Sequence, residues 1–253
     1  MAVVHEITVP MPEGAGLPAF LALPDATSAP KRGDPRPAVL VIHELLGLDD
    51  NMRRIGTRFA NAGYPTLVPD FFAGLGPKPI CIVRFARGIS RVGTGLPYRR
   101  LAAAQDWLAS HPDVAGGPIG VAGFCMGGGF AILYAVGADV AVVAPFYAAV
   151  PEDPAALSGI CPTVASYGGR DRVFGPQAER LDEALTRLGV DHEVKVYPDA
   201  GHAFMSQYGG VLAGIGARLP SRNGYAPDAA EDAWRRTFAF FERHLRHVAV
   251  ADG

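Results

Sequence analysis

The stretch VAGFCMGGGF, residues 121–130, places a cysteine among glycines directly after an apolar run. Gly123, Cys125 and Gly127 give it the pattern Gly-x-Cys-x-Gly. The same pattern with serine forms a sharp strand-to-helix turn that holds a nucleophile in a strained backbone conformation. Glycine is needed at both outer positions because a side chain there would collide with the strand or the helix. The stretch therefore predicts a tight turn that presents the Cys125 thiol.

Two other interpretations of this stretch remain open from these residues alone. Cys125 is either a nucleophile or a small buried side chain, with the glycines present for close helix–strand packing. A dinucleotide-binding loop is the third interpretation, but the stretch does not spell Gly-x-Gly-x-x-Gly and the next strand lacks the expected acidic residue. If Cys125 is the nucleophile, the partial positive charge of the helix N-terminus is expected to increase its thiolate fraction.

Outward from this turn, short apolar runs rich in β-branched residues alternate with helical stretches. Strands that are apolar on both faces are typical of a parallel sheet covered by helices on each side. Two earlier strands, at 3–9 and 18–23, precede a proline-rich surface loop at 24–37. The later strands are expected at 37–43, 64–70, 117–124, 140–147, 161–169 and 192–200. The chain reads as one doubly wound α/β domain over residues 1–253.

The last helix has one apolar stripe that faces the core. Pro227 and Asp228 supply its start. Its core-facing residues recur with helical spacing and are Ala230, Ala233, Trp234, Thr237, Phe238, Phe241 and Leu245.

Composition indicates a small-molecule partner. Hydrophobic residues make up 49% of the chain and charged ones 19%, with a formal net charge of -2. This balance gives no reason to expect nucleic acid or a membrane surface as partner. The 3 cysteines are too few for a disulfide framework, and the N-terminus does not resemble a secretory signal, so we expect a cytoplasmic protein. The oligomeric state is not indicated, and we expect no cofactor and no metal.

Two further segments complete a set of groups for nucleophilic catalysis. Asp171 follows the strand that ends near Tyr167, and His202 follows the last strand. Both leave carboxyl ends of strands, where the working residues of open parallel sheets lie. Each alone has an ordinary alternative, an Asx-turn or helix cap for Asp171 and a surface position for His202. Asp199 is a rival candidate for the acid of this set, but a role in its Tyr-Pro-Asp turn is sufficient to explain the residue. The order nucleophile, acid, histidine predicts a triad.

Several segments together resemble the dienelactone hydrolase family, from about Pro37 to His244. They are HELLGLDDNMRRIGTRFANAGYPTLVPDFF, GFCMGG, GGRDRVF and AGHAF. The resemblance implies an α/β-hydrolase fold and a triad of Cys125, His202 and Asp171. In such a fold the oxyanion of the reacting carbonyl is held by two backbone N–H groups, here those of Leu45 and Met126.

The resemblance also assigns a function to Glu44, the glutamate of HELLG. The resemblance implies that this carboxylate keeps the resting thiol neutral and accepts its proton when substrate arrives. An adjacent carboxylate does disfavour a thiolate. The alternative is a hydrogen bond that pins the loop. His43 is expected to be structural. The HELLG stretch lacks the second histidine of an HExxH motif, so it does not indicate a zinc site.

The sequence departs from the family where the substrate is held. Family members that open dienelactones bind the substrate carboxylate with arginines, one of them four residues after the histidine, where this chain has Ser206. Arg84, Arg87 and Arg91 are candidate replacements within the unassigned segment 71–100, although ordinary solvated arginines are the simpler interpretation. The loop at 204–227 is long enough to be a lid or a binding loop.

The predicted function is cleavage of an ester or lactone bond through Cys125, His202 and Asp171. A broad-range carboxylesterase acting through the same triad is one alternative. A non-catalytic binding or regulatory protein that retains the fold is another.

Overall fold

The computed structural model describes residues 1–12, 14–25, 35–76, 95–208, 221 and 224–246. Within these residues eight strands form one sheet, in the order β1-β2-β4-β3-β5-β6-β7-β8. The strands are β1 (Val3–Val9), β2 (Leu17–Leu23), β3 (Ala38–Ile42), β4 (Thr66–Pro69), β5 (Ile119–Phe124), β6 (Val142–Phe146), β7 (Thr163–Gly168) and β8 (His192–Tyr197). The helices are α1 (Asp50–Asn61), α3 (Leu96–Ser110), α4 (Met126–Ala135), α5 (Gln177–Leu188) and α7 (Pro227–Arg246), with a short 3-10 helix η2 (Pro154–Leu157).

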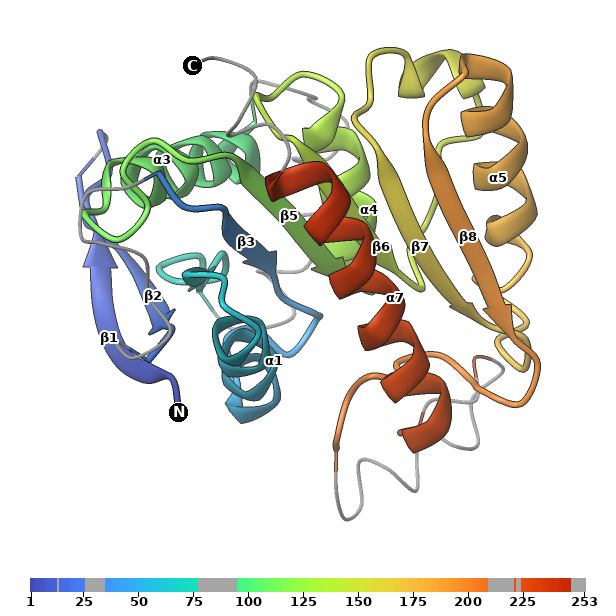
Figure 1. Ribbon diagram of the computed structural model, residues 1–253, viewed down its shortest axis with the longest axis horizontal. Helices are drawn as coiled ribbons and strands as arrows, with labels where there is room; N and C mark the ends of the chain where they lie inside the picture. Colours follow the sequence, from blue (N-terminus) through green and yellow to red (C-terminus); the bar gives the residue numbers. More distant parts are fainter. Residues whose placement is uncertain (13, 26–34, 77–94, 209–220, 222–223, 247–253) are drawn as a thin grey trace.

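The sheet is mainly parallel. β1 pairs with β2, and β2 with β4, in antiparallel fashion, whereas β4, β3, β5, β6, β7 and β8 run parallel to one another. The chain passes from β3 outward to β4, then returns to β5 on the other side of β3 (Figure 1). The doubly wound α/β architecture predicted from the sequence is confirmed.

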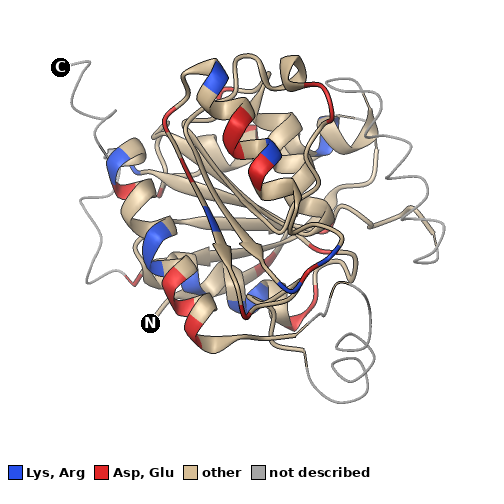
Figure 2. Ribbon diagram, turned by 90° about the vertical axis from the view of Figure 1, so that its right-hand side faces the viewer, with Lys and Arg blue, Asp and Glu red and all other residues tan. Residues whose placement is uncertain are grey.

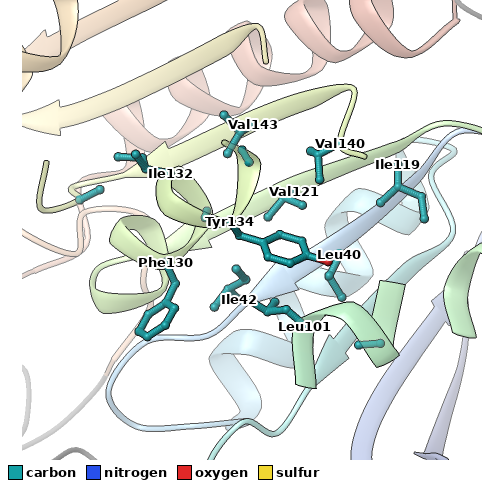
Figure 3. Packing of buried hydrophobic residues seen from close by; sticks show 14 of the residues in the cluster. Leu40, Ile42, Leu101, Ile119, Val121, Phe130, Ile132, Tyr134, Val140 and Val143 are labelled. Atoms are coloured by element: carbon teal, nitrogen blue, oxygen red, sulfur yellow. The ribbon is translucent and has the colours of Figure 1, made fainter. Parts of the chain in front are cut away.

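Helices cover both faces of the sheet because its strands are apolar on both faces. On β3, Leu40 and Ile42 belong to the core under α3, α4 and α5, while Val39 and Val41 belong to the core under α1 and α7. This alternation is the period-2 geometry of a strand. Figure 3 shows the first core, in which Phe130 of α4 packs beside residues of the central strands.

The final helix begins at the predicted residue. Its predicted stripe is buried except at Phe238, which is only partly buried, and Phe240 is fully buried instead. Phe238 still stacks on Trp234 with ring centroids 5.3 Å apart. The buried face of α7 is therefore wider than the predicted stripe.

Charged residues are frequent on the helices that cover this framework. Figure 2 shows Lys and Arg beside Asp and Glu on the helices of the face that it presents. No helix in the described ranges is both long and apolar enough to span a membrane.

Candidate active site

Cys125 lies at the turn between β5 and α4, in a strained backbone conformation. Its φ is 55° and its ψ is -118°. For a residue other than glycine such a conformation costs about 1–3 kcal/mol and persists only where the surroundings hold it. The Cys125 N–H donates to the carbonyl of Phe146, N···O 3.0 Å, and its own carbonyl accepts from the N–H of Gly128 at 3.0 Å. The tight turn predicted from the sequence is present.

The two glycines of the pattern make this turn sterically feasible. A Cβ on Gly123 would lie 2.1 Å from the carbonyl oxygen of Gly127. A Cβ on Gly127 would lie 2.4 Å from the carbonyl oxygen of Ile42 and 2.6 Å from that of His43. Helix α4 therefore begins in direct backbone contact with the end of β3.

His202 connects Cys125 with Asp171. Its Nε2 is 3.1 Å from the Cys125 Sγ, and its Nδ1 is 2.7 Å from the Asp171 Oδ2. The ring contacts the rings of Tyr147 and Phe174, with centroid separations of 4.9 and 4.7 Å. Because the ionised carboxylate can only accept, Nδ1 carries the proton and Nε2 is left to accept from the thiol.

Asp171 forms an Asx-turn and also contacts His202. Its Oδ1 accepts from the backbone N–H groups of Val173 and Phe174 at 2.9 and 3.0 Å, while Oδ2 faces His202. The side chain is buried. The two interpretations of Asp171 from the sequence are therefore compatible, because each uses a different oxygen.

Asp199, the rival acid, points away from this arrangement. Its side chain is 93% exposed and pairs with Arg170, N···O 3.1 Å. It has a surface position, as its turn suggested.

Glu44 follows β3 and is buried among hydroxyl groups. Its Oε1 accepts from the hydroxyls of Tyr147 and Ser206, each at 2.8 Å, and its Oε2 accepts from the hydroxyl of Tyr208. Tyr147, at the end of β6, and Tyr208 were not among the predicted site residues. Tyr147 could have been found from its position, since it follows a parallel strand at the edge that carries the other groups.

Burial dominates the proton affinities at this site. Burial and then the charge of Glu44 raise the pKa of the Cys125 thiol to about 12, although the Met126 N–H lowers it. Burial also raises the pKa of Glu44, and the hydroxyls of Tyr208, Ser206 and Tyr147 oppose that rise. The helix start acts in the expected direction, since the Met126 N–H lowers the pKa of the thiol, but desolvation outweighs it in the resting site.

His43 pins the loop that carries Glu44. Its Nδ1 donates to the Glu44 carbonyl at 2.8 Å, and its Nε2 accepts from the Phe71 N–H at 3.0 Å. Burial lowers its pKa, which keeps the ring neutral. The structural assignment of His43 fits these contacts.

The remaining predicted residues are placed only in part. Met126 follows Cys125 at the first turn of α4, and Leu45, 39% exposed, follows Glu44. Ser206 is buried against Glu44. Arg84, Arg87 and Arg91 lie outside the described residues, as does most of the loop at 204–227. Among the residues that are described, no three or more His, Cys, Asp or Glu gather into a metal site.

Comparison with known proteins gives consistent likenesses over nearly the whole chain. A model of the dienelactone hydrolase family matches residues 18–245. A protein of Methylorubrum extorquens named "Putative carboxymethylenebutenolidase" is 28% identical over 259 residues, covering 96% of this chain and 81% of that protein.

Solved structures resemble the chain in fold. Dienelactone hydrolase from Anabaena variabilis has a TM-score of 0.68 at 21% identity, covering 97% of this chain and 99% of its own. An α/β-hydrolase enzyme from a deep-sea metagenome library has a TM-score of 0.68 at 14% identity, covering 97% of this chain and 98% of its own. These likenesses confirm the predicted α/β-hydrolase fold.

Proposed function

The chain belongs to the dienelactone hydrolase family and is a hydrolase, and on this premise we propose that it cleaves an ester or lactone through Cys125. The observation that carries the proposal is the double contact of His202, 3.1 Å to the Cys125 Sγ and 2.7 Å to the Asp171 Oδ2. A nucleophile, a base and a group that orients the base are the parts that this chemistry needs.

In the proposed reaction the resting thiol is neutral and loses its proton only when substrate is present. Glu44, whose charge already acts on the thiol, takes up that proton. The thiolate attacks the carbonyl carbon, and the N–H groups of Leu45 and Met126 hold the oxyanion. The C–O bond then breaks, the leaving oxygen takes up the proton that the thiol released, and the acyl group stays on Sγ.

Release of the acyl group uses the same histidine. His202 accepts a proton from water, and the hydroxide attacks the thioester carbonyl. The C–S bond breaks, the acid leaves, and the sulfur takes the proton back from His202, so that the thiol re-forms. Asp171 supports this step because its carboxylate stabilises the imidazolium that forms. No cofactor enters the proposed cycle.

A broad-range carboxylesterase is the second candidate. Ser206 favours it, because this serine stands where family members that open dienelactones have an arginine for the substrate carboxylate. This side chain is committed to Glu44 and Tyr147, with contacts of 2.8 and 3.2 Å. A substrate panel that spans dienelactones and uncharged short-chain esters separates the two candidates by their kcat/KM values.

The test compares Cys125→Ala with the unmodified protein on a dienelactone and on short p-nitrophenyl esters. We expect the variant to lose at least 10³-fold in kcat, since only oxyanion binding and positioning remain. Cys161→Ala is the matched control, because Cys161 is a free, partly buried cysteine that packs against the core. Equal turnover by the Cys125 variant and the unmodified protein would end the proposal, whereas failure of Cys125 to react with a thiol-directed probe in folded protein would favour the non-catalytic alternative.

A further inference from the structure

The Glu44 carboxylate contacts hydroxyl groups that the proposed reaction leaves unused. Ser206 Oγ and Tyr147 Oη each lie 2.8 Å from Oε1, and the Tyr208 hydroxyl contacts Oε2. Ser206 and Tyr208 come from the segment just after His202, whereas Glu44 follows β3. Two distant parts of the chain therefore meet at this carboxylate.

Counting protons shows which form of Glu44 this arrangement favours. Each hydroxyl has one proton, and an ionised carboxylate can accept all three. If Glu44 is protonated, its own O–H competes for these partners, and a hydroxyl must turn away or become an acceptor. Hydrogen bonds that are made to the charged form stabilise it. The hydroxyls thus oppose the effect of burial on this group.

Other charged and titratable groups act on Glu44 from a greater distance than the hydroxyls. The guanidinium of Arg54, on α1, is bonded to the Asn51 side chain at 2.9 Å and to the Met205 carbonyl at 2.7 Å. Besides Tyr147 and Tyr208, whose hydroxyls contact the carboxylate directly, the groups with an electrostatic effect on or from Glu44 are Arg54, Cys125 and His202.

We propose that Ser206 and Tyr208 are positioning residues that hold Glu44 in its ionised form and thereby set the pH range in which Cys125 can be deprotonated. The proposal rests on the proposed function, in which Glu44 accepts the thiol proton. Neither residue touches the reacting atoms in this scheme. Both act on Cys125 only through the charge of Glu44.

Loss of either hydroxyl has two effects of opposite sign. The pKa of Glu44 rises, so the carboxylate becomes neutral over a wider pH range and accepts the thiol proton less well. In that same range the neutral Glu44 no longer opposes the Cys125 thiolate, so the resting thiol becomes more reactive. A merely structural disturbance does not combine slower turnover with faster alkylation and a shifted pH profile.

The experiment uses the full chain with Ser206→Ala and Tyr208→Phe, and Ser206→Thr as the conservative variant. The readouts are the pH profile of kcat/KM on a p-nitrophenyl ester and the pH profile of Cys125 alkylation by iodoacetamide. Tyr197→Phe is the matched control, because its hydroxyl also donates to a carboxylate, Asp232 Oδ2 at 2.9 Å, away from this site.

We expect the acidic limb of the kcat/KM profile to move up by about one pH unit in either variant, for one lost hydrogen bond to a charged group. At pH values between the original acidic limb and the shifted one, alkylation of Cys125 should accelerate several-fold, up to about tenfold. Ser206→Thr should restore the original limb, and Tyr197→Phe should leave it in place. In a Glu44→Gln background, Tyr208→Phe should move neither profile further.

Unmoved profiles in folded Ser206→Ala or Tyr208→Phe protein would overturn the proposal, as would a shift that persists in the Glu44→Gln background. If Tyr208→Phe does not fold, Ser206→Ala and Ser206→Thr decide alone. If the unmodified protein turns over no ester, the proposed function fails, while the alkylation profiles still decide the role of Ser206 and Tyr208.

Discussion

At the scale of single residues, Asp171 is the clearest case of two tasks carried by one side chain. One oxygen holds the turn through the N–H groups of Val173 and Phe174, and the other orients His202. The two tasks differ in what they require, because the turn needs only an acceptor whereas His202 needs the charge. A single substitution can therefore separate stability from activity.

Asp171→Asn makes this separation. The amide oxygen can keep the turn, which leaves the amide NH₂ facing His202 Nδ1 and forces the histidine proton onto Nε2. By analogy with serine triads, kcat should fall about 10⁴-fold, while the free energy of unfolding changes by less than about 1 kcal/mol. Ester kinetics and urea unfolding measure the two effects.

Asp199→Asn serves as the control for this prediction, since Asp199 is an exposed acid of the neighbouring turn. It should leave both kcat and stability unchanged. A large loss of kcat in Asp199→Asn, with Asp171→Asn nearly active, would reverse the assignment of the acid.

At the scale of elements, the start of α4 is fixed by its contact with β3. The space for a side chain on Gly127 is taken by the carbonyls of Ile42 and His43. By contrast, a Cβ on Gly129, two residues further along the same helix, would only meet the Ala149 carbonyl oxygen at 3.4 Å. The two glycines of this helix thus differ in whether the surrounding structure leaves room for a side chain.

Gly127→Ala should therefore destabilise the protein by about 1–3 kcal/mol through overpacking, and should lower kcat because the helix start carries the Met126 N–H. Gly129→Ala should be neutral or stabilise by up to about 1 kcal/mol, as alanine favours a helix. Thermal unfolding and ester kinetics on both variants check this. Equal stability of the two variants would contradict the steric account of the turn.

The elements themselves were largely predictable, and the exceptions have physical reasons. The runs of apolar β-branched residues gave β3, β5, β6 and β7 within two residues at each end, because strands buried on both faces leave a continuous apolar signal. The helix Leu96–Ser110 was not predicted. Its first residues lie in the unassigned segment 71–100, although proline in the first turn is a normal helix start.

The candidate site was predictable where the groups are fixed by strand ends and turns. Cys125, Asp171 and His202 each follow a parallel strand, so their proximity follows from the sheet. The hydroxyls around Glu44 were not predictable, since nothing in the residues around Tyr208 indicates which carboxylate they meet. The contribution of burial to the raised pKa of Cys125 was not predictable for a related reason, because burial is a property of the folded chain.

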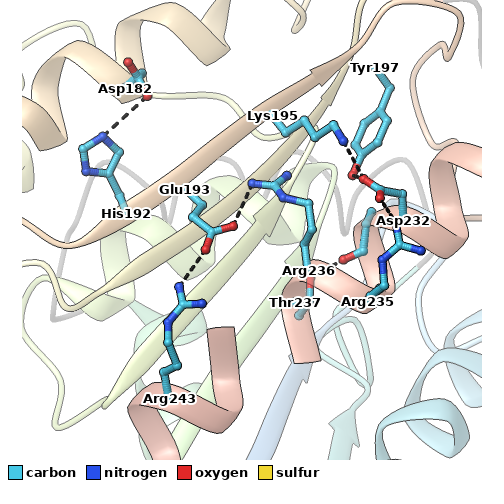
Figure 4. A network of polar contacts seen from close by, with 11 residues as sticks. Asp182, His192, Glu193, Lys195, Tyr197, Asp232, Arg235, Arg236, Thr237 and Arg243 are labelled. Atoms are coloured by element: carbon cyan, nitrogen blue, oxygen red, sulfur yellow. Dashed lines mark hydrogen bonds and ion pairs between the residues drawn. The ribbon is translucent and has the colours of Figure 1, made fainter. Parts of the chain in front are cut away.

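At the scale of the whole molecule, the outer strand β8 is tied to α7 by ion pairs (Figure 4). Glu193 on β8 lies 3.1 Å from Arg236 and 2.6 Å from Arg243, both on α7. Lys195 lies 2.7 Å from Asp232 of the same helix. Burial alone would raise the pKa of Glu193, but the Arg243 and Arg236 guanidiniums bring it below its ordinary value.

Glu193→Gln should lower the free energy of unfolding by up to about 1 kcal/mol at pH 7, as partly exposed pairs contribute little each. Because the folded-state pKa of Glu193 is lowered, its contribution is present above the unfolded pKa and disappears as pH falls through the lower, folded value. Urea unfolding at pH 7 and in acid measures this. The difference in the free energy of unfolding between the variant and the unmodified protein should become smaller below about pH 4. A difference that grows in acid would contradict this.

The site draws its groups from strands spread across most of the chain, and this has a consequence for biosynthesis. A ribosome that has just added Asp171 has already made the thiol and both carboxylates, but the imidazole still lies 31 residues ahead. No nascent fragment that ends before His202 can contain the proposed pair of Cys125 and His202. The proposed triad is thus completed only once His202 has been added, well after the other three groups.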